Sequence, residues 1–173
     1  MILPIVKEPN AILHHKAVTV TQITKEIDQL ITNMIQTMYV AEGVGLAANQ
    51  VGSNLNLFVA NPVGEKGKGR EIVLINAVLQ QREGTETSSE GCLSLPGVSG
   101  DVKRSAQVVA IGLDRTGKKV AIEASGLLAK IVQHETDHLA GHLFPDRLGL
   151  LQRRQILKKY KKLADTLRQV SLE

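Results

Sequence analysis

Apolar residues recur along the chain at two periods, and each period predicts a different kind of element. Between residues 23 and 38 they follow one another at three- and four-residue intervals, which predicts an amphipathic helix. Either Thr21 or Thr24 can cap its start, and Gly43 follows its expected end. The apolar stripe of this helix consists of Ile23, Ile27, Leu30, Ile31, Met34, Ile35 and Met38.

Short apolar runs in the middle of the chain predict strands, which we expect over residues 55–60, 72–75, 107–113 and 119–124. The sequence DRTG at residues 114–117 suits a hairpin turn between the last two strands. Residues 64–69 are rich in Gly and Lys and predict a loop between the first two.

Two further helices are predicted in the last third of the chain. One spans residues 126–139, with Ser125 as a candidate cap and Gly141 just past its end; the other spans about 151–168. No internal repeat or linker is visible, so we expect one α+β domain over residues 1–173. In it, mixed or antiparallel sheets pack around the helix at 126–139, with an amphipathic helix near the N-terminus and a basic helix near the C-terminus.

Composition narrows the class of protein. Hydrophobic residues make up 43% and charged residues 22%, which is typical of a globular protein. Aromatic residues make up only 2%, so the core must be aliphatic and base-stacking platforms for single-stranded nucleic acid are not expected. A lone cysteine excludes an intramolecular disulfide. The N-terminus does not resemble a signal or transit peptide, and no apolar run could span a membrane, so we expect a cytoplasmic protein.

The sequence HETDH at residues 134–138 carries the strongest chemical signal. On a helix, His134 and His138 point the same way, so both imidazoles can reach one metal ion, while Glu135 stays free to move protons. The two histidines continue the apolar face formed by Leu127 and Ile131, which indicates that they turn inward. Metal binding is one direct way to satisfy two buried imidazoles, although such a motif also occurs by chance in helices.

The third ligand decides the kind of metal site. A metzincin would need histidine where Phe144 stands, and a thermolysin-like site would need an acidic residue that the chain lacks between Asp146 and Asp165. Cys92 remains as the candidate, and a Cys/His/His set leaves a fourth position open for water. A lone cysteine is also often just a small buried hydrophobic residue. Fe(II), Zn(II), Co(II) and Ni(II) all suit thiolate and imidazole ligands.

Three motifs in this order and spacing resemble the signatures of peptide deformylases: GVGLAANQ at residues 43–50, EGCLS at 90–94 and QHETDH at 133–138. The resemblance extends from the N-terminal segment to about Leu148. It implies an enzyme that removes formate from the N-terminal formyl-methionine of newly synthesised polypeptides in bacteria or organelles. It further implies one divalent metal ion per chain, Fe(II) in most members, held by Cys92, His134 and His138.

The resemblance also implies the roles of the remaining site residues. Metal-bound hydroxide attacks the formyl carbon, Glu135 acts as general acid and base, and Gln50 with the backbone N–H of Leu93 stabilises the oxyanion. We expect an extended substrate to lie against Gly43, Gly45 and Gly91, which permit close backbone approach. Val44, Leu127 and Ile131 are candidates for the methionine pocket, and plain core packing explains each of them equally well.

The chain departs from the common family pattern at a few positions. Asn49 stands where proline is frequent, which we expect to loosen its loop, and Ser99 and Lys103 replace a frequent arginine and proline. Ser99 is expected to weaken contacts with the distal part of a peptide. Arg104 is retained, and we expect it to pair with Glu42.

The predicted C-terminal helix is strongly basic: its charges are Arg153, Arg154, Lys158, Lys159, Lys161 and Lys162. Such a face is most simply a solvated helix surface, and the alternative is contact with ribosomal RNA.

Two other functions compete with deformylation. One is a peptidase that cuts internal bonds; the other is a metal- or peptide-binding module without activity, which would need neither Glu135 nor Gln50.

Overall fold

The computed structural model describes residues 1–64 and 70–170. Within them the α-helices are α1 (Lys25–Val40), α2 (Gly126–Leu139) and α3 (Leu150–Val170). The strands are β1 (Gly45–Ala47), β2 (Leu57–Ala60), β3 (Ile72–Glu83), β4 (Glu86–Cys92), β5 (Leu95–Arg104), β6 (Gln107–Leu113) and β7 (Lys119–Ser125). Three short 3-10 helices are η1 (Ala11–His14), η2 (Ala48–Val51) and η3 (Phe144–Arg147).

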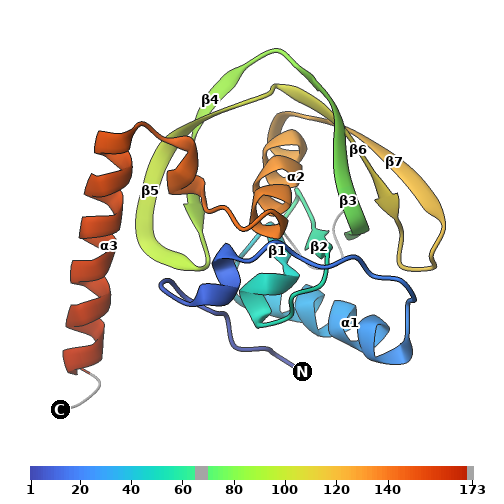
Figure 1. Ribbon diagram of the computed structural model, residues 1–173, viewed down its shortest axis with the longest axis horizontal. Coiled ribbons are helices and arrows are strands. Elements are labelled where there is room, and N and C mark those ends of the chain that lie inside the picture. The colour runs from blue at the N-terminus through green and yellow to red at the C-terminus, as the bar shows by residue number, and fades with distance from the viewer. Residues whose placement is uncertain (65–69, 171–173) are drawn as a thin grey trace.

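The strands form two antiparallel sheets. Five strands are arranged in the order β1-β2-β3-β6-β7, and β4 pairs with β5 in a separate hairpin (Figure 1). The predicted α+β class is therefore confirmed, with antiparallel pairing throughout both sheets. The predicted turn at residues 114–117 joins β6 to β7, where the Asp114 N–H donates to the Lys118 carbonyl at 2.9 Å.

One predicted strand was too short, and one hairpin lies outside the predicted strands. The strand predicted over residues 72–75 continues to Glu83, because β3 keeps pairing with β6 through two register shifts despite its polar second half. The β4–β5 hairpin lies outside the four predicted strands, since neither of its strands contains a continuous hydrophobic run. The predicted loop at 64–69 lies, apart from Gly64, outside the described residues.

The capping residues explain where the helices begin and end. Thr24 caps α1, its Oγ1 accepting from the Ile27 N–H at 3.4 Å. Ser125 stands at the N-cap of α2 without making a side-chain capping bond. Gly141 follows α2 with φ +82°, and a Cβ there would lie 2.6 Å from the His14 carbonyl oxygen. Only glycine fits this turn, which directs the chain away from α2.

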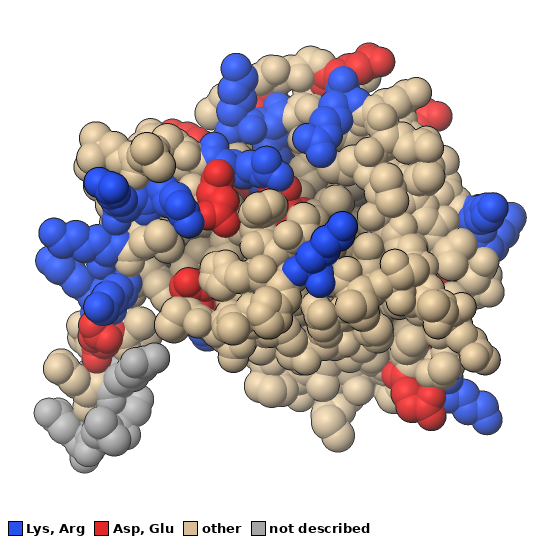
Figure 2. Space-filling view, in the orientation of Figure 1, with Lys and Arg blue, Asp and Glu red and all other residues tan. Residues whose placement is uncertain are grey.

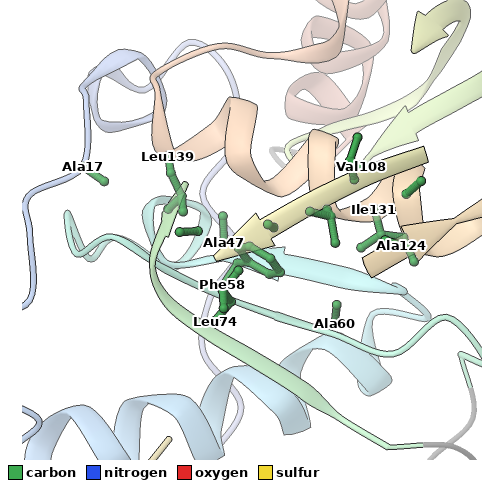
Figure 3. Close-up of a cluster of buried hydrophobic side chains, with 13 residues drawn as sticks. Ala17, Ala47, Phe58, Ala60, Leu74, Val108, Ala124, Ile131 and Leu139 are labelled. Atoms are coloured by element: carbon green, nitrogen blue, oxygen red, sulfur yellow. The ribbon is translucent and has the colours of Figure 1, made fainter. Parts of the chain in front are cut away.

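The five-stranded sheet is covered on both faces, and the alternation along β2 shows how. Phe58 and Ala60 pack in the cluster that includes Ile131 of α2, whereas Leu57 and Val59 pack with Ile31, Met34 and Met38 of α1. Successive strand residues point to opposite faces, so one strand serves both helices. Figure 3 shows Leu139 of α2 beside Ala47, and Ile131 of α2 beside Ala124, in this cluster. The core is chiefly aliphatic, as predicted.

α3 runs along the outside of the β4–β5 hairpin (Figure 1). Ile156 and Tyr160 pack there with Val98 and Val102 of β5. Gly100 makes the close packing possible, since a Cβ on it would lie 2.8 Å from Ile156 Cδ1. None of the helices in the described part of the chain combines the length and apolarity that crossing a membrane requires.

Candidate metal centre and catalytic site

Three metal-ligating side chains from two elements meet at one point. His134 and His138 lie one turn apart on α2, and Cys92 is the last residue of β4. Cys92 Sγ is 3.2 Å from His138 Nε2, which is 3.2 Å from His134 Nε2. The three donor atoms all lie within 4.8 Å of one another. The structure thus brings together all the predicted metal ligands.

The spacing of the two imidazole nitrogens fits binding to one tetrahedral cation. Two imidazole nitrogens bound at about 2.0–2.1 Å to one tetrahedral ion are separated by roughly 3.3 Å, close to the 3.2 Å between the two Nε2 atoms. The set has one soft thiolate and two imidazoles, and a fourth position is left for a small ligand.

Electrostatics favour the ionised form of the thiol. Burial alone would raise the pKa of Cys92, but charge and hydrogen bonding from His138 and His134 outweigh it and hold that pKa well below its ordinary value. For His134, burial favours the neutral ring, yet hydrogen bonds to Cys92 and Glu90 raise its pKa well above the usual value. The lowered pKa of Cys92 favours its thiolate form, which is the form that binds a cation.

A buried carboxylate orients the first histidine. Glu90 Oε2 lies 3.0 Å from His134 Nδ1, which leaves Nε2 facing Cys92 and His138. Arg104 holds Glu90 through Nε at 2.5 Å and Nη2 at 2.8 Å. Such a carboxylate–histidine pair fixes the ring and increases its basicity as a ligand.

The prediction that Arg104 pairs with Glu42 was wrong. Arg104 is buried between Glu90 and Asp137, with Nη1 2.8 Å from Asp137 Oδ2. Burial would raise the pKa of Asp137, but hydrogen bonds from Arg147 and Arg104 lower it. A buried guanidinium needs carboxylates that are equally removed from water, and Glu42 lies at the cavity instead.

Glu135 is buried beside the cluster with an uncommitted carboxylate. It is only 3% exposed, and its Oε2 has no hydrogen-bond partner among the described residues. Burial raises the pKa of its carboxyl above the usual range. A Cβ on Gly45 would lie 2.4 Å from Glu135 Oε1. Gly45 was expected to admit substrate backbone, but the space that its missing side chain frees is taken by this carboxylate.

Gln50 reaches the cluster from η2. Its Nε2 is 3.5 Å from Cys92 Sγ and 3.2 Å from Ser94 Oγ, while its Oε1 accepts from the Ala47 N–H at 2.9 Å. The carbonyl end is thus fixed by its own loop and the NH₂ end points toward the thiolate. Leu93 follows Cys92 directly in the turn between β4 and β5.

A cavity of about 410 Å³ opens beside this cluster and gathers nearly all the predicted site residues. They are Gly43, Val44, Gly45, Gln50, Gly91, Cys92, Leu93, Leu127, Ile131, His134 and Glu135. His138 lies behind the cavity wall, 1% exposed.

One of these residues, Leu127, departs from the expectation of an inward-turned face. Leu127 is 50% exposed and stands at the surface rather than on a buried face, whereas Ile131 is 4% exposed and belongs to the core cluster as well. At Gly91 a Cβ would make only ordinary contact, 3.6 Å from the Val98 carbonyl oxygen, so packing within the protein does not itself require glycine there.

The Asn49 side chain joins its loop to α2, a contact that the expected loosening of the loop did not include. It is fully buried, and its Nδ2 donates to the His138 carbonyl at 2.6 Å.

Sequence reasoning also assigned no role to Glu90 and Asp137. The sequence feature that could have indicated a role is that both are acidic residues inside or beside the ligand motifs. A buried histidine ligand needs a hydrogen-bond acceptor, which such a residue can supply.

Comparison with known proteins agrees with this geometry. The sequence profile of the family described as "Polypeptide deformylase" matches residues 2–154. The chain belongs to the polypeptide deformylase family. A relative named peptide deformylase from Thermodesulfovibrio yellowstonii is 47% identical over 160 residues, which are 92% of this chain and 97% of that protein.

Solved deformylase structures have the same fold. The crystal structure of a peptide deformylase from Legionella pneumophila superposes with a TM-score of 0.91 at 39% identity, covering 97% of this chain and 98% of that one. A peptide deformylase from Synechococcus elongatus, in complex with actinonin, gives a TM-score of 0.86 at 41% identity, over 91% and 86% of the two chains. The protein is a metal-dependent hydrolase that acts on N-formylmethionine peptides in protein biosynthesis.

Proposed function

We propose that this deformylase holds one divalent cation, Fe(II) in its native state, through Cys92, His134 and His138. The bound cation would polarise the formyl group and lower the pKa of a water molecule, supplying hydroxide at neutral pH. The observation that carries the proposal is the uncommitted Glu135 carboxylate, buried at the same cavity as the ligand set. A carboxyl whose pKa is raised by burial is suited to exchange protons near neutral pH.

Each remaining group has a separate task in this proposal. Glu135 takes a proton from water and delivers it to the leaving amine. Its carboxylate breaks no hydrogen bond within the described part of the chain when it does so. Negative charge on the formyl oxygen is stabilised by the Gln50 amide and the Leu93 N–H. The orientation of Gln50, with its Oε1 fixed by Ala47, supports this assignment because the amide needs no rearrangement to donate.

The substrate is proposed to lie extended between β1 and the turn after β4. β1 is an edge strand of its sheet, so main-chain pairing with a peptide is open to it, and such pairing tolerates many side chains after the methionine. Gly43 and Gly91 line this path, and Val44, Leu127 and Ile131 form an apolar wall for the methionine side chain.

Formate release tests the proposal. The enzyme should be purified without oxygen, its metal measured, and Fe(II)- and Ni(II)-loaded samples assayed on formyl-Met-Ala-Ser beside the unblocked peptide. We expect formate from the first peptide and no cleavage of the second. Cleavage of internal bonds would instead support the metallopeptidase. Loaded enzyme that binds the formylated peptide without turnover would support a binding module.

We also propose that the enzyme works in the cytoplasm close to the ribosome, where formylated chains emerge. The basic side chains of α3 support this, since Arg153, Arg154, Lys158, Lys159, Lys161 and Lys162 are exposed. Figure 2 shows Lys and Arg side chains gathered over α3.

Replacing Arg154, Lys158 and Lys162 by Gln should weaken ribosome binding and flatten its dependence on salt, because fewer phosphates would be neutralised. Formyl-Met-Ala-Ser turnover should stay unchanged. Equal binding of the triple variant and the parent at low salt would contradict the contact.

A further inference from the structure

The N-terminal segment at residues 6–8 joins the two parts of the site that carry the proposed oxyanion donors. The Val6 N–H donates to the Gln50 carbonyl at 2.8 Å, and the Glu8 N–H donates to the Ser94 carbonyl at 3.0 Å. One short stretch of chain is therefore hydrogen-bonded to η2 and to the turn after β4. The distance between the two proposed donors depends on a segment that lies outside the cavity itself.

The Lys7 side chain adds a charged bond between these two backbone bonds. Its Nζ donates to the Leu93 carbonyl at 2.5 Å. That carbonyl belongs to the peptide unit whose N–H is that of Ser94, and in a trans peptide the two groups point in opposite directions. The Ser94 N–H lies 3.4 Å from Cys92 Sγ. A cation thus stands at one end of this peptide unit and the ligand sulfur at the other.

This arrangement has two physical consequences. Fixing the Leu93 carbonyl restrains the backbone on both sides of Leu93, including the N–H proposed to bind the oxyanion. An ammonium on the carbonyl also polarises the peptide unit and strengthens the hydrogen bond that its N–H makes to sulfur. Hydrogen bonds to a ligand atom are a known means of tuning a metal centre.

The segment is also held from its outer side. The Tyr160 hydroxyl of α3 donates to the Glu8 carbonyl at 3.0 Å, and Tyr160 is 7% exposed. The backbone position of residues 6–8 therefore does not depend on the Lys7 side chain. Lys7 is exposed, so replacing it should leave the fold intact and remove only the charged bond.

We infer that Lys7 is a positioning residue of the oxyanion site: its ammonium holds and polarises the Leu93–Ser94 peptide beside the ligand Cys92. The inference rests on the proposed function, in which the Leu93 N–H and the Gln50 amide stabilise the oxyanion. The cation acts through the backbone and does not touch the reacting atoms.

The experiment compares Lys7→Met, Lys7→Arg and Lys16→Met in the full-length, metal-loaded enzyme. Lys16 is an exposed lysine that follows η1, and no hydrogen bond or ion pair is found for it within residues 1–64 and 70–170. Lys7→Met should lower kcat roughly tenfold with KM within about twofold, less than the 100-fold or greater loss expected on deleting an oxyanion donor. Lys7→Arg should restore most of kcat, and Lys16→Met should match the parent.

A second readout does not use activity. In ¹⁵N-labelled, Zn(II)-loaded protein, Lys7→Met should move the Ser94 and Leu93 amide proton resonances, the Ser94 proton upfield, as its bond to sulfur weakens. Thermal melting of each variant should coincide with that of the parent, which separates the effect from unfolding.

Three results would overturn the inference: amide resonances of Lys7→Met that equal those of Lys16→Met, an unchanged kcat, or a loss that Lys7→Arg fails to restore. Gln50→Ala measured beside them tests the proposed function itself. A full rate in that variant would refute the oxyanion assignment. A large loss of kcat in Gln50→Ala together with an unchanged kcat in Lys7→Met would refute only the role of Lys7.

Discussion

Gly45 and Glu135 share one small volume: a Cβ added to the glycine would lie 2.4 Å from the carboxylate Oε1 and 2.9 Å from Ile131 Cγ2. The glycine of the first motif thus makes room for the acid of the third. This relationship ties an edge strand of the sheet to the helix that carries the histidines.

Gly45→Ala should therefore damage catalysis more than folding. The methyl group must push the Glu135 carboxylate or β1 aside, and we expect kcat to fall on the order of 100-fold, as for a misplacement of about 1 Å. Overpacking should cost about 1–3 kcal/mol of unfolding free energy. Formate release and urea unfolding measure the two. Gly149→Ala is the control, because a Cβ there meets nothing within 4 Å; equal activity of both variants would contradict the prediction.

Glu135→Gln keeps the shape of the side chain and removes its charge. We expect activity to fall by about 10²–10⁴-fold, the usual contribution of general acid–base catalysis. The unfolding free energy of the metal-free protein should stay the same or rise, because the buried Oε2 has no hydrogen-bond partner to lose among the described residues. Formate release and urea unfolding test both halves. A strongly destabilised variant would mean that Glu135 has a structural task instead.

Glu90→Gln should weaken metal binding. The change removes the anionic acceptor of His134 Nδ1 and one carboxylate partner of Arg104. Loss of such a partner typically lowers metal affinity by about 10–100-fold, and breaking a buried ion pair costs about 3–5 kcal/mol. Competition with a chelator gives the affinity. Glu86→Gln is the matched control on β4, since Glu86 is exposed and pairs with Lys130; similar affinities for the two variants would refute the role of Glu90.

Asn49→Asp should destabilise the protein although it changes only one group. The new oxygen would face the His138 carbonyl, which Nδ2 now reaches at 2.6 Å, and the charge would be fully buried. We expect a loss of about 2–4 kcal/mol in unfolding free energy at pH 7. Urea unfolding measures it. Asn10→Asp provides the comparison, because Asn10 caps η1 and aspartate caps equally well; equal stability of both variants would refute the tie between Asn49 and α2.

The sequence pattern was sufficient to predict those elements that depend only on neighbouring residues. The stripe of α1, the Thr24 cap and the turn at residues 114–117 each depend on a few neighbouring residues. The β4–β5 hairpin lies outside the predicted strands, since its strands are mostly polar and α3 packs against it from outside. Long-range packing of this kind leaves little trace in the sequence of either strand.

In the candidate site, too, some features follow from the local sequence and others from long-range packing. The sequence by itself determined the candidate ligands, since the spacing of His134 and His138 and the lone Cys92 restrict the possible metal sites before any fold is known. Only the tertiary structure decided which groups surround them. Glu90 is hydrogen-bonded to His134, Arg104 to Glu90, and Lys7 to the Leu93 carbonyl. Helical spacing is a local geometric constraint, whereas partners of buried charges are chosen by desolvation, which depends on the whole packed molecule.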